Sequence, residues 1–120
     1  MKKTTTAASL FKGRTYQKYR KLFLSNPGAL EAFPFGPQVA VYKTKGKMFA
    51  TLSPEDGVWY ANLKCDPLWA QALRKQYPAV QPGYHMNKKH WNTVTLDGSL
   101  PDSLVHKMAE LSYVLVSPAK

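Results

Sequence analysis

The segment YHMNKKHWNTVTLDGSLPD, residues 84–102, predicts a loop, a strand, a turn and the start of a helix. Polar and apolar residues alternate over 92–96, which is typical of a half-buried strand, and Asp97-Gly98 is typical of a tight turn. Ser99, three residues before Asp102, is predicted to cap the last helix. The apolar stripe predicted for that helix is Leu104, Met108, Leu111 and Leu115.

The part of the chain before this segment begins with a helix and a series of strands. Tyr16, Tyr19 and Phe23 recur at helical spacing, and Asn26-Pro27-Gly28 ends that helix. Alternating runs predict strands over 39–42, 48–52 and 58–63. Their connections are a tight turn at Lys45-Gly46 and a longer turn over 53–57, so that no proline lies inside a strand.

A second helix is predicted to begin after Asp66, an N-cap acid that Pro67 follows at the first helical position. Its apolar stripe is Trp69, Ala72 and Leu73. A short edge strand is predicted over 79–83, because Pro82 and Gly83 do not favour a longer one.

This element order predicts an α+β fold, a two-layer α/β domain with a five-stranded antiparallel sheet and its helices on one side. We expect residues 1–12 to be a flexible tail and residues 13–120 to form a single domain. The helix-facing core is predicted to contain Trp69, Leu73, Leu104, Met108, Leu111 and Leu115.

The charge of the chain is strongly positive, with 17 basic and 7 acidic residues and a net charge of +10. Residues 1–30 and 67–96 contain no acidic residue. Two acid-free blocks indicate a positive surface that attracts polyanions by releasing their counterions. A soluble protein that is merely basic would show the same composition.

Several classes of protein do not fit the sequence. No apolar run is long enough to span a membrane, and the start MKKTTTAASLF lacks the apolar region of a signal peptide, so we expect a cytoplasmic protein. A single cysteine, Cys65, excludes an intramolecular disulfide. His85, His90 and His106 match no metal-binding spacing, and we expect neither a metal nor a cofactor.

The candidate nucleic-acid contacts are cationic, imidazole and amide side chains in three segments. Lys88, Lys89 and His90 could grip phosphates beside the ring of Trp91, although tryptophan is more often a core residue and exposed lysines are often only solvated. The full set of candidates is Arg14, Lys18, Lys21, Arg74, Lys75, His85, Asn87, Lys88, Lys89 and His90.

Three other features have structural interpretations. The strip of Arg14, Lys18 and Lys21 on the first helix is typical of an ordinary solvated face. The aromatic segment 33–37 is interpreted as a structural turn. Cys65 lies near a helix N-terminus, but the neighbouring carboxylate of Asp66 opposes a thiolate, so we expect a packed and unreactive cysteine.

The chain resembles the MmcQ/YjbR family of small bacterial proteins over about residues 14–116. The matching segments are NPGALEAFPFGP (26–37), VYKTKGKMFA (41–50), NLKCDP (62–67), QYPAVQPGYHMNKKHWNTVTLDGSLPD (76–102) and SYVLV (112–116). The resemblance implies an α-β-β-β-α-β-β-α order and binding of double-stranded DNA, and it brings no catalytic residues. Relatives commonly have paired acids before the PFG motif, where this chain has Leu30-Glu31-Ala32.

Three functions follow from these observations. The leading one is binding of double-stranded DNA with low sequence specificity, because the sequence shows no recognition helix rich in Arg, Asn and Gln. The alternative is a protein-interaction or dimerisation domain. An enzyme would need a pocket around Tyr84, His85, His90 and Asp97, and we expect no catalytic activity. We further expect no membrane association and a monomer or weak homodimer.

Overall fold

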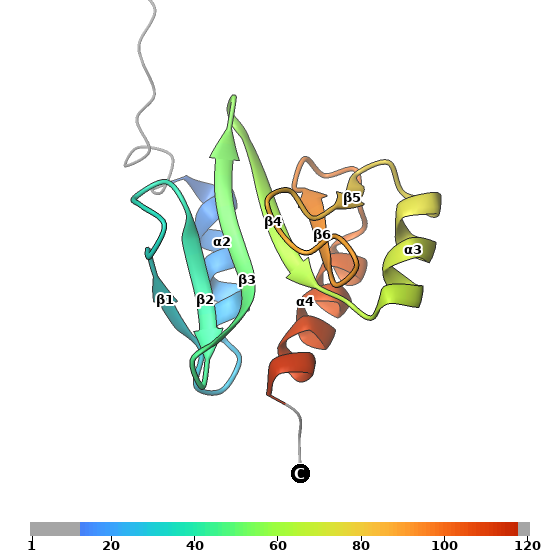
Figure 1. The fold of residues 1–120 in the computed structure, drawn as a ribbon. Coiled ribbons are helices and arrows are strands. Elements are labelled where there is room, and N and C mark those ends of the chain that lie inside the picture. Colours follow the sequence, from blue (N-terminus) through green and yellow to red (C-terminus); the bar gives the residue numbers. More distant parts are fainter. Residues whose placement is uncertain (1–12, 118–120) are drawn as a thin grey trace, which may run out of the picture.

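The computed structural model describes residues 13–117, which form three helices and a six-stranded antiparallel sheet (Figure 1). In chain order the elements are α2 (Arg14–Leu24), β1 (Leu30–Ala32), β2 (Ala40–Thr44), β3 (Lys47–Glu55), β4 (Val58–Lys64), α3 (Pro67–Gln76), β5 (Val80–Pro82), β6 (Trp91–Thr95) and α4 (Asp102–Val116). The strands lie in the order β1-β2-β3-β4-β6-β5. The predicted α+β class is confirmed, and the tail predicted over residues 1–12 lies outside the described residues.

The difference between five and six strands is the edge strand β1, which the sequence does not predict. Glu31 pairs with Tyr42 of β2 in the ladder. Its side chain accepts hydrogen bonds from the hydroxyls of Tyr42, at 2.6 Å, and Tyr16. A three-residue strand is too short to show a period, so long-range pairing creates this element rather than local pattern.

The two hairpins that join β2, β3 and β4 each turn on two residues with positive φ. Lys45 and Gly46 have φ of 53° and 77°, and Asp56 and Gly57 have φ of 52° and 81°. These values suit type I′ turns, which match the twist of the flanking strands. The predicted Lys45-Gly46 turn is confirmed, whereas the second turn is shorter than the one predicted over 53–57.

Pro54 lies inside β3, opposite Trp59, which corrects the prediction that prolines avoid these strands. The β2–β3 ladder reaches only to the pair of Ala40 and Leu52. Pro54 is therefore past the end of that ladder, where its missing N–H removes no hydrogen bond to β2.

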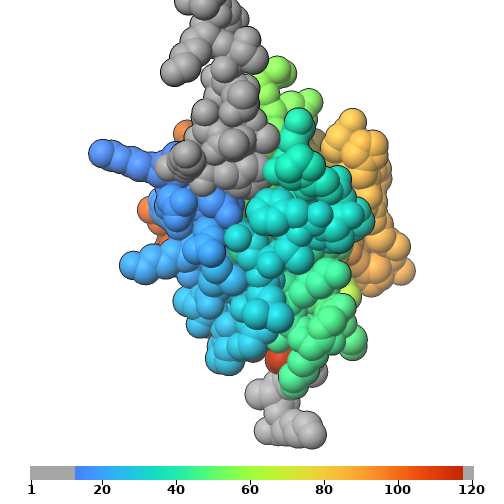
Figure 2. All heavy atoms as spheres, turned by 90° about the vertical axis from the view of Figure 1, so that its left-hand side faces the viewer, coloured from blue at the N-terminus to red at the C-terminus, as the bar shows by residue number. Residues whose placement is uncertain are grey.

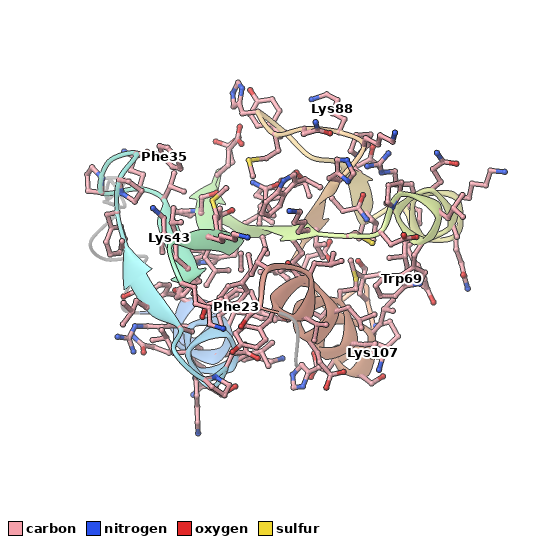
Figure 3. The ribbon with its side chains drawn as sticks, turned by 60° about the horizontal axis from the view of Figure 1, so that its bottom comes forward. Phe23, Phe35, Lys43, Trp69, Lys88 and Lys107 are labelled. Carbon is pink, nitrogen blue, oxygen red and sulfur yellow. The ribbon has the colours of Figure 1, made fainter. Side chains whose placement is uncertain are left out.

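Helices α2 and α4 cover one face of the sheet, and α3 packs beside β5 (Figures 1 and 3). The predicted α2 stripe of Tyr16, Tyr19 and Phe23 is buried. The ring centroid of Phe23 lies 5.1 Å from that of Tyr42 and 6.4 Å from that of Phe49. This aromatic cluster anchors α2 to β2 and β3.

The core-facing stripe of α4 differs from the predicted one. Met108 is buried, but Leu104 and Leu111 are only half-buried and Leu115 is 46% exposed. The buried residues of the helix are Val105, Met108, Ala109, Ser112 and Val116. Small side chains at two of these positions allow the helix backbone to approach β3 and β4 closely, which a count of large apolar residues does not anticipate.

Ser112 of α4 also has a polar role in the core. Its Oγ accepts a hydrogen bond from the N–H of Lys64 at 2.8 Å and donates one to the carbonyl of Phe49. The β2–β3 register shifts beside this point, because Tyr42 pairs with Ala50 but Lys43 pairs with Met48. The serine therefore bonds backbone groups beside an irregularity in the ladder.

The two predicted helix caps have opposite outcomes. The Asp66 cap is confirmed, because its carboxylate accepts the N–H groups of Leu68 at 3.1 Å and Trp69 at 3.3 Å. The Ser99 cap is wrong: α4 begins at Asp102, and its N-cap residue is proline. The N–H of Ser99 bonds instead to Asp97 Oδ1 at 3.0 Å, which forms a separate turn.

The stripe of α3 is partly as predicted. Leu73 is buried and Trp69 is half-buried against the core. Ala72 is exposed, and Ala70 takes the buried position. Across residues 13–117, no helix has both the length and the apolar character needed to cross a bilayer.

Candidate functional site

The loop of residues 83–90 lies on the face of the sheet opposite α2 and α4 (Figures 1 and 3). The N–H of Gly83 donates to the carbonyl of Trp91 at 2.9 Å. A Cβ on Gly83 would lie 2.8 Å from the Cβ of Trp91, so the close approach requires glycine. Trp91 itself is buried, which confirms its interpretation as a packed residue, although it lies under this loop and outside the main core cluster.

Arg74 of α3 fixes the end of this loop from the side. Its Nε donates to Asn92 Oδ1 at 2.7 Å, and its Nη2 donates to the carbonyls of Trp91, at 3.0 Å, and Lys88. The guanidinium satisfies a buried amide oxygen and two backbone carbonyls, and so acts as a structural brace. The phosphate contact expected of Arg74 stays a prediction.

Two further candidates also bond within the loop. Asn87 Oδ1 accepts the N–H groups of Lys89 at 2.9 Å and His90 at 3.3 Å, as in an Asx turn. The Nζ of Lys88 donates to the carbonyl of Gly83 at 3.0 Å, yet the residue remains exposed. Asn87 is therefore occupied in shaping the loop, while Lys88 retains further donors on its ammonium group.

The lysine candidates that stay available are Lys88 and Lys89 of the loop and Lys75, which follows Arg74 on α3, and all three are exposed. We call these three residues the cationic loop surface. His90 is half-buried, and its carbonyl accepts the N–H of Cys65 at 2.7 Å. The backbone that carries the lysines is thus held by hydrogen bonds at both ends of the loop.

The α2 candidates lie on the other side of the sheet from the cationic loop surface. Figure 2 shows α2, in blue, and the 80–90 segment, in orange, on opposite sides of the β1 edge. Arg14 and Lys21 are exposed, but Lys18 forms an ion pair with Asp102 at 3.0 Å. The two acid-free blocks of the sequence therefore do not combine into one positive surface in the described part of the chain.

The open face of the sheet carries a trough that the sequence analysis did not find. Its floor follows the strand register, because Thr51 pairs with Asn62 and Asn62 pairs with Thr93. Thr93 Oγ1 donates to Asn62 Oδ1 at 2.5 Å and accepts the N–H of Tyr84 at 2.8 Å. The floor is therefore polar, ordered and bonded directly to the 83–90 loop.

The hollow above this floor has a volume of about 480 Å³. One wall is the β1–β2 connection with Phe35, which is 70% exposed. The other wall is Tyr84, His85 and Met86. Phe35 lies on the side of the sheet away from α2 and α4, as Lys88 does (Figure 3). Segment 33–37, interpreted from sequence as a structural turn, thus also presents an aromatic ring to the trough.

His85 has a left-handed backbone conformation, with φ of 59°. Histidine enters this region more readily than most residues other than glycine. Its ring centroid lies 3.9 Å from that of Tyr84, and both residues line the hollow. His85 therefore belongs to the trough wall, whereas His90 and Asp97, the other side chains an enzyme pocket was expected to need, do not line this hollow.

The open face of the sheet is basic beyond one end of the trough, and the trough is acidic at its other end. Side chains alternate between faces along a strand, so Lys64 shares the face of Asn62, and Lys43 shares the face of Val39, which lines the hollow. Glu55 lines the opposite end. The polar alternation along β3 and β4 is the signal from which the sequence could have revealed this face.

Glu31, the acid of the Leu30-Glu31-Ala32 segment, has an internal structural role. Besides the two tyrosine hydroxyls, it accepts a hydrogen bond from Arg20 Nε at 3.2 Å. Burial raises the pKa of this carboxyl, but the bonds from Tyr16, Tyr42 and Arg20 outweigh it, so the pKa is lowered overall. Glu31 thus ties α2 and β2 to β1.

Cys65 is buried, and burial together with Asp66 raises the pKa of its thiol to about 11. A thiol with that pKa is almost fully protonated near neutral pH and is a poor nucleophile. Within residues 13–117, no cluster of three or more His, Cys, Asp or Glu side chains is arranged to hold a metal ion.

Comparison with known proteins identifies the family to which this α+β domain belongs. The family model YjbR matches residues 24–115. YbdF of Escherichia coli O157:H7 is 37% identical over 101 residues, 84% of this chain and 83% of that protein. YjbR of Escherichia coli K12 is 36% identical over 90 residues, 75% of this chain and 76% of that protein. The chain therefore belongs to the YjbR family.

Solved structures agree with this assignment. The Deinococcus radiodurans protein DR2400, a DUF419 domain, superposes with a TM-score of 0.80 at 38% identity, covering 85% of this chain and 78% of that one. A Pseudomonas syringae protein superposes with a TM-score of 0.74 at 29% identity, covering 87% of this chain and 98% of that one. YbdF and YjbR are themselves described as uncharacterised.

Proposed function

We propose that this YjbR-family protein binds nucleic acid through the cationic loop surface, with double-stranded DNA as its main ligand. The observation that carries the proposal is the combination of three exposed lysines with a braced backbone. Lys75, Lys88 and Lys89 are exposed, and residues 67–96 contain no acidic side chain that could neutralise them locally. Such a surface attracts phosphates by counterion release.

The brace supports binding because it reduces the ordering that binding requires. Arg74 and Asn87 fix the backbone that positions Lys88 and Lys89. Only the lysine side chains then lose freedom when phosphates are bound. Because the loop is already ordered, the entropy cost of ordering its backbone does not reduce the binding affinity.

The same brace favours low sequence specificity. Arginine and asparagine are among the side chains that read base edges through two hydrogen bonds at once. In this loop Arg74 and Asn87 are occupied by internal hydrogen bonds, and the available cations are lysines, which contact phosphates as point charges. We propose accordingly that the protein is a non-catalytic binder of the phosphate backbone and is a monomer or weak homodimer.

A salt-dependent titration with fluorescent duplex DNA tests this function. Three lysine contacts predict a slope of log affinity against log salt of about −3. Lys88→Ala combined with Lys89→Ala should weaken binding similarly for unrelated sequences and flatten the slope by about two. The matched control is Lys21→Ala with Lys107→Ala, which removes two exposed lysines from the helix side.

The outcomes separate the surface from the function. An equal loss of duplex affinity in the two double variants would mean that net charge, and not the cationic loop surface, governs binding. An unchanged salt slope in the folded Lys88→Ala/Lys89→Ala variant would exclude the cationic loop surface as the DNA-binding site. A lack of duplex binding even at low salt would reject the function and favour a protein-interaction domain.

A further inference from the structure

We infer that the open-face trough is a binding site for a nucleotide with an unpaired base, either free or at an unstacked position of a strand. The inference goes beyond duplex binding by the cationic loop surface and stands on different residues. The hollow of about 480 Å³ falls within the usual size of small-ligand sites. It is formed by side chains from two strands, β3 and β4, and from two loops, so its shape depends on how these four segments pack together.

The walls of the trough supply the groups that hold a base. Phe35 and Tyr84 are 70% and 63% exposed and belong to opposite walls. Exposed aromatic rings on a domain of this size offer faces on which a base can stack. A hollow of the same volume beside α2 and α4 contains no phenylalanine, tyrosine or tryptophan, so it lacks the aromatic lining that the trough has.

The floor supplies polar groups without a fixed charge beneath the base. Asn62 uses its Oδ1 to accept from Thr93, which leaves the Nδ2 end of the amide as a donor to a ligand. Thr51 Oγ1 accepts the N–H of Asn62 at 3.2 Å, so that its hydroxyl is held on the same row. Amide and hydroxyl groups at the bottom of an aromatic hollow suit the edge of a heterocyclic base better than an apolar ligand.

The charge gradient along the trough orients the ligand. Lys64 lies two residues beyond Asn62, about 7 Å along β4. Lys43 occupies the same end of the neighbouring strands, while Glu55 lines the other end of the hollow. A phosphate is attracted to the lysine end and repelled from the glutamate end, so the base lies over Asn62 and the phosphate beside Lys43 and Lys64.

The test is an NMR titration of the full chain with AMP, adenosine and ribose 5-phosphate. AMP should shift the amide resonances of the trough, with adenosine binding about tenfold more weakly because it lacks the phosphate. Phe35→Ala combined with Tyr84→Ala should weaken AMP about tenfold. Lys43→Ala combined with Lys64→Ala should abolish the preference for AMP over adenosine.

Matched controls use exposed residues away from the trough. Leu68→Ala changes a 79% exposed side chain on α3, and Lys107→Ala removes a lysine from α4, on the opposite side of the sheet (Figure 3). Both should leave AMP binding unchanged. Thermal unfolding of every variant checks that the fold is intact, which is expected because Phe35 and Tyr84 are exposed.

A parallel titration with a short single strand and a hairpin duplex identifies the source of the nucleotide. Loss of single-strand binding in the Phe35/Tyr84 variant would place an unstacked nucleotide of the nucleic-acid strand in the trough. Retention of AMP binding by the Lys88/Lys89 variant would show that the trough and the cationic loop surface are separate sites. The inference would be overturned if the amide resonances of the trough showed no saturable shift with millimolar AMP or with the single strand. It would also be overturned if the shifts persisted in both trough variants. Neither outcome depends on the result for duplex DNA.

Discussion

The two faces of the sheet are stabilised by different kinds of contact. On the helix side, Phe23 is fully buried among the aromatic rings of Tyr42 and Phe49. On the loop side, Arg74 and Asn87 hold an exposed segment with hydrogen bonds. Apolar burial contributes stability in proportion to the area removed from water, whereas hydrogen bonds fix the position of a segment without covering it. The helix side is therefore the source of stability, and the loop side is the surface left for a ligand.

The largest expected effect is on the helix side. Phe23→Ala removes a completely buried ring, and should lower the free energy of unfolding by about 3–5 kcal/mol through lost transfer energy and a residual cavity. Urea denaturation followed by circular dichroism measures the change. Leu68→Ala on exposed α3 is the control and should alter the free energy by less than about 0.5 kcal/mol. A loss below about 1 kcal/mol for Phe23→Ala would contradict the assignment of stability to this face.

A smaller and more local effect is expected on the loop side. Arg74→Ala leaves the buried Oδ1 of Asn92 and the carbonyl of Lys88 without their donor and removes one of the two donors to the carbonyl of Trp91, which should cost about 2 kcal/mol. Hydrogen exchange should accelerate mainly over residues 83–92, with α2 and β3 little changed. The control is Lys75→Ala, which changes the exposed residue next to Arg74 and should leave the hydrogen-exchange rates unchanged. Uniform acceleration across the sheet after Arg74→Ala would show that the two faces are not independent.

The smallest expected effect depends on pH. The pKa of Glu31 is lowered in the fold, so this carboxylate stabilises the protein above its unfolded pKa, and that contribution is lost as pH falls below about 4.5. Glu31→Gln should therefore destabilise the protein by about 1 kcal/mol at pH 7, with a difference that shrinks in acid. Thermal unfolding of both proteins from pH 7 to pH 3 measures this. A constant difference across that range would mean that the charge of Glu31 has no part in holding β1.

Local sequence determined much of the fold. The Lys45-Gly46 turn, the Asp66 cap and the aromatic stripe of α2 each depend on residues within one or two turns of chain, and all three are present. The α+β class and the YjbR family follow from the same local patterns joined in order. Interactions of this range leave a signal in the sequence because the residues that form them are neighbours.

The tertiary structure alone decided the rest. Glu31 creates β1 only because Tyr16 and Tyr42 reach it, and Ser112 faces the core only because Lys64 and Phe49 present backbone groups there. The sequence shows basic residues both in α2 and in the 83–90 loop, but it does not show that the sheet lies between these two groups. Which side chains share a face depends on strand order and register, and these are set by pairing between residues far apart in the chain.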